Sequence, residues 1–119
     1  MKEVTDKNFE NEVLRCKLPV FVCFTAEWCG PCYPTCLLAA ELMKRYSGRV
    51  KFVKINIDKS PEISTKYHII PLPTILMFRE SQPVKKLVGF QSKKSLRLLL
   101  DKVIAEQELP KTGEISQAG

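Results

Sequence analysis

Runs of apolar residues along the chain predict four β-strands. Val20–Thr25 is β-branched and aromatic with almost no polar residue, which is typical of a strand that is buried on both faces beside parallel neighbours. Val50–Ile57 predicts a second buried strand, although it contains one lysine. Thr74–Phe78 and Val84–Val88 complete the set. Because only a short turn at Ser81–Pro83 joins these last two, we expect them to pair antiparallel.

Four further segments have the apolar spacing or the boundary residues of helices. They are a short helix from Thr5 or Asp6 to about Cys16, a helix over Cys32–Tyr46, a short helix over Asp58–Tyr67, and a last helix capped by Ser92. The last helix is the clearest, because its apolar residues repeat at intervals of three and four. These residues are Leu96, Leu99, Leu100, Val103 and Ile104.

The order of the elements predicts an α/β architecture. We expect a central sheet of four strands, or five if residues 1–4 add an edge, flanked by about four helices on both faces. At 119 residues the chain is long enough for one domain and too short for two, and we expect this domain to cover residues 1–106. Residues 107–119 are mostly polar and contain Pro110 and Gly113, so a flexible tail without a catalytic part is expected there.

Composition argues against two classes of partner. No apolar stretch approaches the roughly 20 residues that span a bilayer, and the first residues lack the apolar region of a secretory signal, so we expect a cytoplasmic protein without a membrane partner. Nineteen Lys and Arg residues against 13 Asp and Glu give a net charge of +6. The basic residues near the end of the chain lack the glycine and aromatic residues typical of nucleic-acid surfaces. We interpret them as a solvated helix face that also steers acidic partners.

The candidate chemistry lies in the segment Trp28-Cys29-Gly30-Pro31-Cys32. Two cysteines separated by two residues close into a small disulfide ring or open as a dithiol, so the segment predicts a redox site. It follows the first predicted strand, and open α/β sheets place their sites at the carboxyl ends of strands. We therefore expect the sulfurs at the open mouth of the sheet. If Cys29 begins the next helix, unpaired N–H groups and the helix macrodipole stabilise its thiolate.

The other cysteines and the single histidine are weaker candidates for a functional role than Cys29 and Cys32. Five cysteines, all in the first third of the chain, do not fit a secreted disulfide framework. A zinc site needs four ligands, and His68, Cys36 and Cys23 supply no second Cys-x-x-Cys motif, so no metal is predicted. Cys16 and Cys23 are interpreted as packing residues, and His68 as a loop residue at a helix end. Cys36, one helical turn after Cys32, is either a regulatory thiol or, as is more common, a small core residue.

Four motifs together carry a family likeness that extends from about Val4 to Ile104. They are Phe24-Thr25-Ala26-Glu27-Trp28-Cys29-Gly30-Pro31-Cys32, Val53-Lys54-Ile55-Asn56-Ile57-Asp58, Leu72-Pro73-Thr74 and Val88-Gly89. In these motifs the chain resembles the thioredoxin family, and the proline between the two cysteines resembles the reducing members. The resemblance implies the thioredoxin fold, with a mixed central sheet, and a protein-disulfide reductase that works through a reversible Cys29–Cys32 disulfide.

The same resemblance implies a role for each residue of the site. Cys29 would be the attacking thiol and Cys32 the resolving thiol. Pro73 would be the cis-proline that faces the disulfide, and Leu72 would offer its backbone to an extended substrate. The apolar surface that receives substrates would comprise Trp28, Gly30, Pro31, Val88, Gly89 and Phe90.

Three positions depart from the family pattern. Cys23 stands where the family commonly has a buried aspartate that accepts the proton of the resolving cysteine, whereas Lys54 keeps the usual partner lysine. Lys54 then either stays charged and lowers the pKa of the thiols, or is neutral or turned to solvent while resolution relies on water. Thr25 replaces a common tryptophan, and Leu37 replaces a helix-kinking proline. We therefore expect a straighter helix, and the redox potential stays open.

These observations predict a general dithiol–disulfide reductase. Its substrates would be proteins that contain disulfides, its electron donor a partner similar to thioredoxin reductase, and its only redox group the cysteine pair, with no further cofactor. We expect a monomer. Two alternatives stay open. One is an oxidase or isomerase of the same fold, and the other is a non-catalytic interaction or chaperone module that binds through the apolar surface near Trp28 and Pro73.

Overall fold

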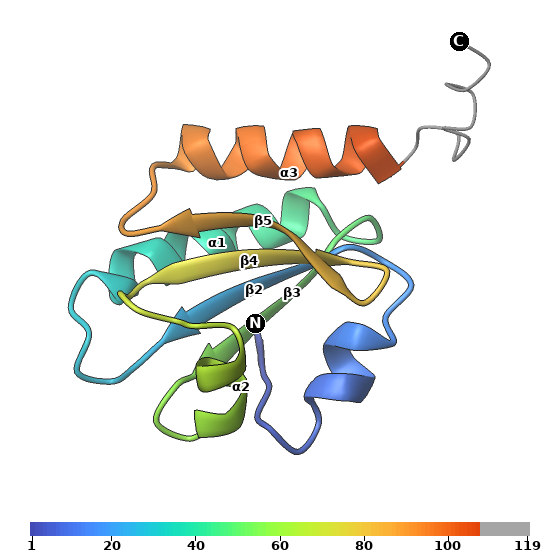
Figure 1. The fold of residues 1–119 in the computed structure, drawn as a ribbon. Helices are drawn as coiled ribbons and strands as arrows, with labels where there is room; N and C mark the ends of the chain where they lie inside the picture. The colour runs from blue at the N-terminus through green and yellow to red at the C-terminus, as the bar shows by residue number, and fades with distance from the viewer. Residues whose placement is uncertain (108–119) are drawn as a thin grey trace, which may run out of the picture.

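A five-stranded mixed sheet forms the centre of the molecule (Figure 1). The computed structural model describes residues 1–107 of the chain. In spatial order the strands are β1 (Lys2–Glu3), β3 (Lys51–Asn56), β2 (Val20–Thr25), β4 (Thr74–Arg79) and β5 (Gln82–Val88). β1, β3 and β2 are parallel, whereas β4 is antiparallel to both β2 and β5. The predicted antiparallel pair and the additional edge strand near the N-terminus are both confirmed.

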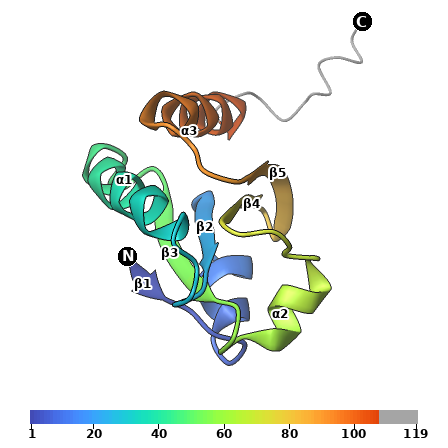
Figure 2. The same cartoon turned by 90° about the vertical axis from the view of Figure 1, so that its left-hand side faces the viewer.

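Helices cover both faces of the sheet, as the sequence predicts (Figure 2). α1 (Cys32–Arg45) and α3 (Lys93–Gln107) lie on one face, and the short helices η1 (Glu10–Leu14) and α2 (Pro61–Lys66) lie on the other. α3 includes Gln107, the first residue of the expected tail, and the rest of that tail lies outside the described residues. No helix within the described part of the chain is long and apolar enough to cross a membrane.

β2 is the central strand, and both of its faces are buried. Phe21 and Cys23 belong to the core beneath α1 and α3. The alternate residues belong to the core on the opposite face; they are Val20, Val22 and Phe24. This alternation follows from the two-residue period of a strand. The expectation of parallel neighbours is half right, because β3 is parallel to β2 and β4 is antiparallel. A strand held on every side is a rigid support for the loop that follows it.

The two long helices have boundaries close to those predicted. Ser92 caps α3, since its Oγ accepts the N–H of Ser95 at 3.1 Å. α1 ends at Arg45 instead of Tyr46. Tyr46 is buried, and its hydroxyl donates to Asp101 of α3 at 2.6 Å. The end of α1 is thereby tied to α3 through a polar contact at the margin of the core.

The hairpin between β4 and β5 is tighter than predicted. The sequence places a turn at Ser81–Pro83, but the last two of these residues already belong to β5. The chain instead reverses at Glu80 and Ser81, whose φ angles are 52° and 69°. Pro83 is tolerated because β5 is an edge strand, and it lies where the register of the ladder shifts.

The first helix differs from the prediction in type and length. Only Glu10–Leu14 is helical, and it is a π-helix in which the N–H of Arg15 donates to a carbonyl five residues earlier at 2.9 Å. The carboxylate of Asp6 does not cap this helix. It accepts the N–H groups of Glu62 and Ile63 at the start of α2, at 3.1 and 3.0 Å. Because these amides have no partner within their own helix, Asp6 joins two segments that are distant in sequence.

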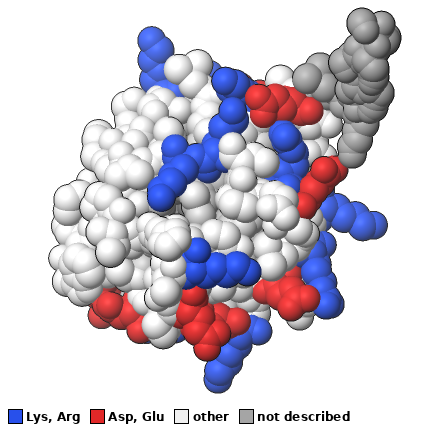
Figure 3. Space-filling view, viewed as in Figure 1, with Lys and Arg blue, Asp and Glu red and all other residues white. Residues whose placement is uncertain are grey.

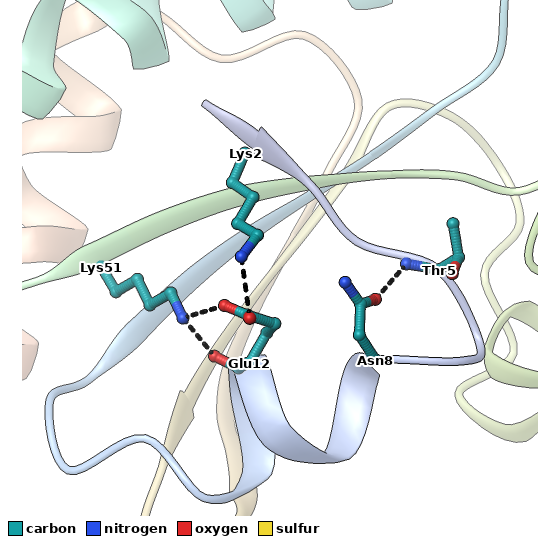
Figure 4. A network of polar contacts seen from close by, with 5 residues as sticks. All are labelled: Lys2, Thr5, Asn8, Glu12 and Lys51. Carbon is teal, nitrogen blue, oxygen red and sulfur yellow. Dashed lines mark hydrogen bonds and ion pairs between the residues drawn. The ribbon is translucent and has the colours of Figure 1, made fainter.

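A polar network fastens η1 to the edge of the sheet (Figure 4). The carboxylate of Glu12 accepts hydrogen bonds from Lys2 Nζ at 2.8 Å and from Lys51 Nζ, which also reaches the Glu12 carbonyl at 2.9 Å. These bonds from Lys2 and Lys51 lower the pKa of Glu12 to about 2. Asn8 accepts the backbone N–H of Thr5 at 2.8 Å just before the helix. The network lies at the amino-terminal end of β3, opposite to the end that carries the candidate site.

Candidate active site

The two cysteines of the Cys-x-x-Cys motif form a disulfide at the carboxyl end of β2, and their Cα atoms are 5.5 Å apart. β2 ends at Thr25, and in the turn that follows, the N–H of Cys29 donates to the carbonyl of Ala26 at 3.1 Å. α1 begins at Cys32 and not at Cys29. Cys29 therefore lies in the turn that leads into the helix, and its carbonyl accepts the N–H of Cys32 at 3.3 Å.

The cysteine side chains are more covered than a position at the open mouth of the sheet predicts. Cys29 is 8% and Cys32 is 3% exposed, and Ala26, Ile57 and Leu72 pack around them. Both cysteines line a cavity of about 410 Å³. Because Cys29 is the more exposed of the two, an incoming sulfur reaches it more easily than it reaches Cys32.

Large apolar side chains are exposed on the segments that approach the disulfide. Among the described residues eight such side chains are exposed, and six belong to the β2–α1 loop, the first turns of α1, the loop before β4, the end of β5 and the connection that follows β5. These six are Trp28, Tyr33, Leu37, Ile70, Val88 and Phe90. The indole of Trp28 is 68% exposed, and its Nε1 donates to Asp58 at 2.8 Å.

The charge distribution agrees with an apolar contact surface. Figure 1 places the β2–α1 loop and the β5–α3 connection at the left-hand end of the molecule. In the matching space-filling view, this end is largely without charge, whereas Lys and Arg side chains are interspersed with Asp and Glu over the rest of the face (Figure 3). An exposed apolar area with few charges is typical of a site that contacts other proteins.

The loop before β4 and the end of β5 lie beside the disulfide. Leu72 packs against the cysteine pair, and the peptide bonds before Pro71 and Pro73 are both cis. The resemblance indicates a cis bond at Pro73 only, so the second is an addition. The carbonyl of Pro73 accepts the N–H of Gly89 at 2.8 Å, and Val88 pairs with the first residue of β4. Residues assigned to the substrate surface from three separate segments are thus neighbours in the fold, while their role in binding stays a prediction.

Cys23 and Lys54, the two positions associated with proton transfer, are partners across β2 and β3. Cys23 is fully buried, and its sulfur lies 3.6 Å from the sulfur of Cys36 on α1. The hydrogen bond with Cys36, together with burial, raises the pKa of Cys23 well above its usual value. The same hydrogen bond, aided by the positive charges of Lys54 and the amino group of Met1, lowers the pKa of Cys36 to about 7. At neutral pH, therefore, Cys23 is a thiol that donates to Cys36, and about half of Cys36 is ionised.

Cys36 is the residue whose setting the sequence described least well. It is partly exposed and lines the same cavity as the disulfide, next to Lys54. Its contact with Cys23 joins a strand to a helix across 13 positions, so no local motif indicates it. The one available signal was its place one helical turn after Cys32. Thr25 and Leu37, the other departures from the family pattern, also line this cavity.

The remaining candidates do not belong to the site. His68 is exposed at the end of α2 with a φ of 53°, which agrees with its interpretation as a loop residue at a helix end. Cys16 is partly buried against the core on the η1 and α2 side. Within residues 1–107, no three His, Cys, Asp or Glu side chains are grouped so that they could hold a metal ion.

Comparison with known proteins establishes the family. The family model described as thioredoxin matches residues 1–102. The chain belongs to the thioredoxin family. A thioredoxin of Rickettsia bellii (strain RML369-C) is 45% identical over 93 residues, which are 78% of this chain and 89% of that protein. Thioredoxin 1 of Synechococcus elongatus (strain ATCC 33912 / PCC 7942 / FACHB-805) is 41% identical over 83% of this chain and 92% of that protein. A chloroplastic M-type thioredoxin of Triticum aestivum is 39% identical over 83% of this chain and 57% of that protein.

Membership of the thioredoxin family, together with a bonded pair of closely spaced cysteines, makes this protein a thiol–disulfide oxidoreductase. Thioredoxins act through a redox-active disulfide, exchange it with disulfides of other proteins and are reduced again by a partner reductase. The predicted thioredoxin fold and the predicted class of activity are confirmed. The roles given to single residues stay predictions.

Proposed function

We propose that the chain reduces disulfide bonds in other proteins, with Cys29 as the attacking thiol and Cys32 as the resolving thiol. The observation that carries this proposal is the Cys29–Cys32 disulfide at the carboxyl end of the central strand, among exposed apolar side chains. Cys29 is the more accessible sulfur, and it lies in the turn that leads into α1, three residues before the helix begins at Cys32. The macrodipole of that helix favours a thiolate over a thiol, which makes Cys29 the better nucleophile.

The proposed reaction transfers two electrons to the substrate. The Cys29 thiolate attacks one sulfur of the substrate disulfide, and the other substrate sulfur leaves as a thiolate. Cys32 then loses its proton and attacks the Cys29 sulfur, which releases the first substrate sulfur. The substrate departs as a dithiol, and the chain keeps the Cys29–Cys32 disulfide, the state present in this structure. A partner reductase supplies two electrons and two protons to restore the dithiol.

Substrate binding is assigned to the surface around the disulfide, formed by Trp28, Gly30, Pro31, Leu72, Pro73, Val88 and Gly89. Within the part of the chain that the structure describes, the backbone N–H and C=O of Leu72 have no hydrogen-bond partner. An extended substrate segment can therefore add to Leu72 as a strand does, through main-chain bonds that select little for sequence. The exposed indole of Trp28 supplies apolar contact area beside it.

Lys54 and Cys23 are assigned to the control of proton transfer. Because its pKa is raised, Cys23 stays protonated at neutral pH and cannot take the proton of Cys32 as a buried carboxylate would. Lys54 lines the cavity together with Cys32, and a positive charge there favours the Cys32 thiolate. Water in the cavity is then the proton acceptor. A Cys23→Asp variant should therefore change the pH dependence of the resolution step, and an unchanged profile and rate would exclude a role for this position.

The setting of the reaction is proposed as the cytoplasm, with a monomeric protein and no further cofactor. Three described cysteines, Cys16, Cys23 and Cys36, remain unpaired thiols, which suits a reducing compartment. Several relatives are bacterial thioredoxins that this chain covers almost from end to end. The reductase that reduces the Cys29–Cys32 disulfide is identified only by its chemistry, as a donor of two electrons to a small disulfide.

Insulin reduction tests the proposal directly. Catalytic amounts of the protein should accelerate the reduction of insulin by dithiothreitol, which is measured as precipitation of the reduced chains. With the Cys29→Ser variant the rate should match that of dithiothreitol alone. Cys16→Ser is the matched control, because it removes a free thiol that lies against a different core, and it should keep full activity. A wild-type protein no faster than Cys29→Ser would overturn the assignment as a reductase.

A further inference from the structure

Cys23 and Cys36 form a second close pair of sulfurs inside the same strand–loop–helix unit. Cys23 lies on β2 and Cys36 on α1, and their Sγ atoms are 3.6 Å apart. A disulfide requires an S–S distance of about 2.05 Å, so the sulfurs need to approach by only about 1.5 Å. Both side chains are short, and rotation about their own bonds can supply a shift of this size.

The two thiols differ in access to reagents. Cys23 is 0% exposed, whereas Cys36 is partly exposed and lines the cavity of about 410 Å³ that also contains Lys54. A reagent in the cavity therefore meets Cys36 and not Cys23. The lowered pKa of Cys36 supports the same order, because the thiolate is the reactive form. The inner pair thus combines a partly exposed sulfur with a fully covered one.

We propose that Cys36 and Cys23 are a second redox pair, in which Cys36 is oxidised by a small hydroperoxide and Cys23 closes the disulfide. The Cys36 thiolate attacks the terminal oxygen of the hydroperoxide, the O–O bond breaks, and an alkoxide or hydroxide ion leaves. The Cys36 sulfenic acid then reacts with the Cys23 thiol; an S–S bond forms, and water departs with the proton of Cys23. Two thiols have been oxidised, and one hydroperoxide has been reduced to an alcohol or to water.

The position of the pair favours a small oxidant over a protein disulfide. Cys36 lines the cavity that Cys29 and Cys32 also line, and a hydroperoxide is small enough to enter it. Protein disulfides, in contrast, are expected at the outer apolar surface near Trp28. The resulting Cys23–Cys36 bond would join β2 covalently to α1, one helical turn from Cys32. A dithiol returns it to the reduced state by thiol–disulfide exchange.

Thiol counting in the full chain with Cys29→Ser and Cys32→Ser tests the proposal apart from the reductase activity. The reduced variant has three thiols, at Cys16, Cys23 and Cys36. After hydrogen peroxide it should retain one, and peptide mapping by mass spectrometry should find Cys23 linked to Cys36. The wild type, which starts with five, should likewise fall to one. The peroxide dose is set as the one that fully oxidises Cys29 and Cys32 in the wild type.

Single variants in the same background separate the two steps. Adding Cys36→Ser should leave Cys16 and Cys23 reduced. Adding Cys23→Ala should stop the reaction at a sulfenic acid on Cys36 that dimedone captures, and circular dichroism checks that this variant is folded. Cys16→Ser is the matched control and should still form the bond. Any of three results would overturn the proposal. They are three free thiols after peroxide, over-oxidation of Cys36 in the variant that keeps Cys23, and a disulfide that includes Cys16.

Discussion

The outer pair, Cys29 and Cys32, and the inner pair, Cys23 and Cys36, are built into the same segment of chain by different means. In the outer pair a turn of two residues brings the sulfurs together, and the exposed surface around them is apolar. In the inner pair the packing of α1 on β2 does so, across 13 positions of sequence. The outer pair is already bonded, whereas the inner pair is 3.6 Å apart and joined by a hydrogen bond.

This difference shows what a cysteine needs for thiol–disulfide exchange with another protein. Cys29 is largely covered, yet it lies beside Trp28 and close to the free backbone of Leu72, so a large partner can dock around it. Cys36 has a lowered pKa and a cavity, but no comparable docking surface is assigned to it. Reactivity alone therefore does not make Cys36 a site for protein disulfides, and the two pairs should respond to different reagents.

Removing one thiol from each pair should give the largest contrast. Cys32→Ser leaves the mixed disulfide without its resolving thiol, so turnover of insulin should fall by at least about 100-fold. Cys36→Ser removes a thiol from the inner pair only, and turnover should stay within about threefold of the wild type. Insulin turbidity with dithiothreitol measures both. An equal loss in the two variants would mean that Cys36 belongs to the catalytic machinery and that the comparison is wrong.

Truncating the apolar surface should affect the outer pair alone. Trp28→Ala removes an exposed indole next to Cys29, and KM for a protein disulfide should rise by about 10-fold, equivalent to about 1.4 kcal/mol, with kcat little changed. Leu98→Ala, which truncates an exposed leucine on α3, is the control and should leave KM unchanged. Peroxide oxidation of Cys36 should be the same in all three proteins. If Trp28→Ala slowed both reactions equally, the apolar surface at Trp28 would serve both pairs, and the comparison would be wrong.

The pH dependence of alkylation should distinguish the inner pair from an ordinary thiol. With Cys29 and Cys32 replaced by serine, the rate at Cys36 should rise with pH and reach half its maximum near pH 7, because the hydrogen bond from Cys23 holds its pKa at about 7 instead of 9.0. Loss of a positive charge disfavours the thiolate. Lys54→Gln should therefore move this midpoint to higher pH and slow alkylation severalfold at pH 7.

Iodoacetamide labelling followed by peptide mass spectrometry reads the rate at Cys36 separately from that at Cys16. Lys7→Gln, at an exposed position near the N-terminus, is the matched control for lost charge. It should leave the midpoint in place. A midpoint that Lys54→Gln does not move, or moves to lower pH, would remove Lys54 as a source of thiolate stabilisation.

The smallest expected effect is on the free energy of unfolding, when the sulfur of Cys23 or of Cys36 is removed. Under reducing conditions Cys23→Ala removes a fully buried sulfur from the core beneath α1 and α3, and the free energy of unfolding should fall by about 1 kcal/mol. Cys36→Ala removes a partly exposed sulfur and should cost about half as much. Urea unfolding measures both. A larger loss for Cys36→Ala than for Cys23→Ala would indicate that the Cys36 sulfur stabilises the fold and does more than line the cavity.

Features with a local cause could be predicted from the sequence. The apolar run gives β2 its limits, the spacing of leucines gives α3 its buried face, and two cysteines around Gly30 and Pro31 give the outer pair. Each of these signals lies within a few residues. The family likeness added Leu72–Pro73 and Val88–Gly89, which local patterns alone would not have brought to the disulfide.

Features that depend on packing between distant segments could not be predicted. Asp6 looked like a cap for its own helix, but the start of α2 lies within reach and takes its carboxylate. The π-helical turn at Glu10–Leu14 has no sequence pattern of its own. The contact between Cys23 and Cys36 depends on how α1 is rotated on β2, which only the folded chain determines. The same holds for the coverage of Cys29, since Leu72 packs on it from another loop.

The most direct test of the central claim is capture of a protein substrate on Cys32→Ser. Reaction of this variant with insulin under non-reducing conditions, followed by peptide mapping of the trapped complex, should show a single mixed disulfide through Cys29. The Cys29→Ser variant should trap nothing under the same conditions. A complex linked through Cys36, or no complex with either variant, would contradict the account.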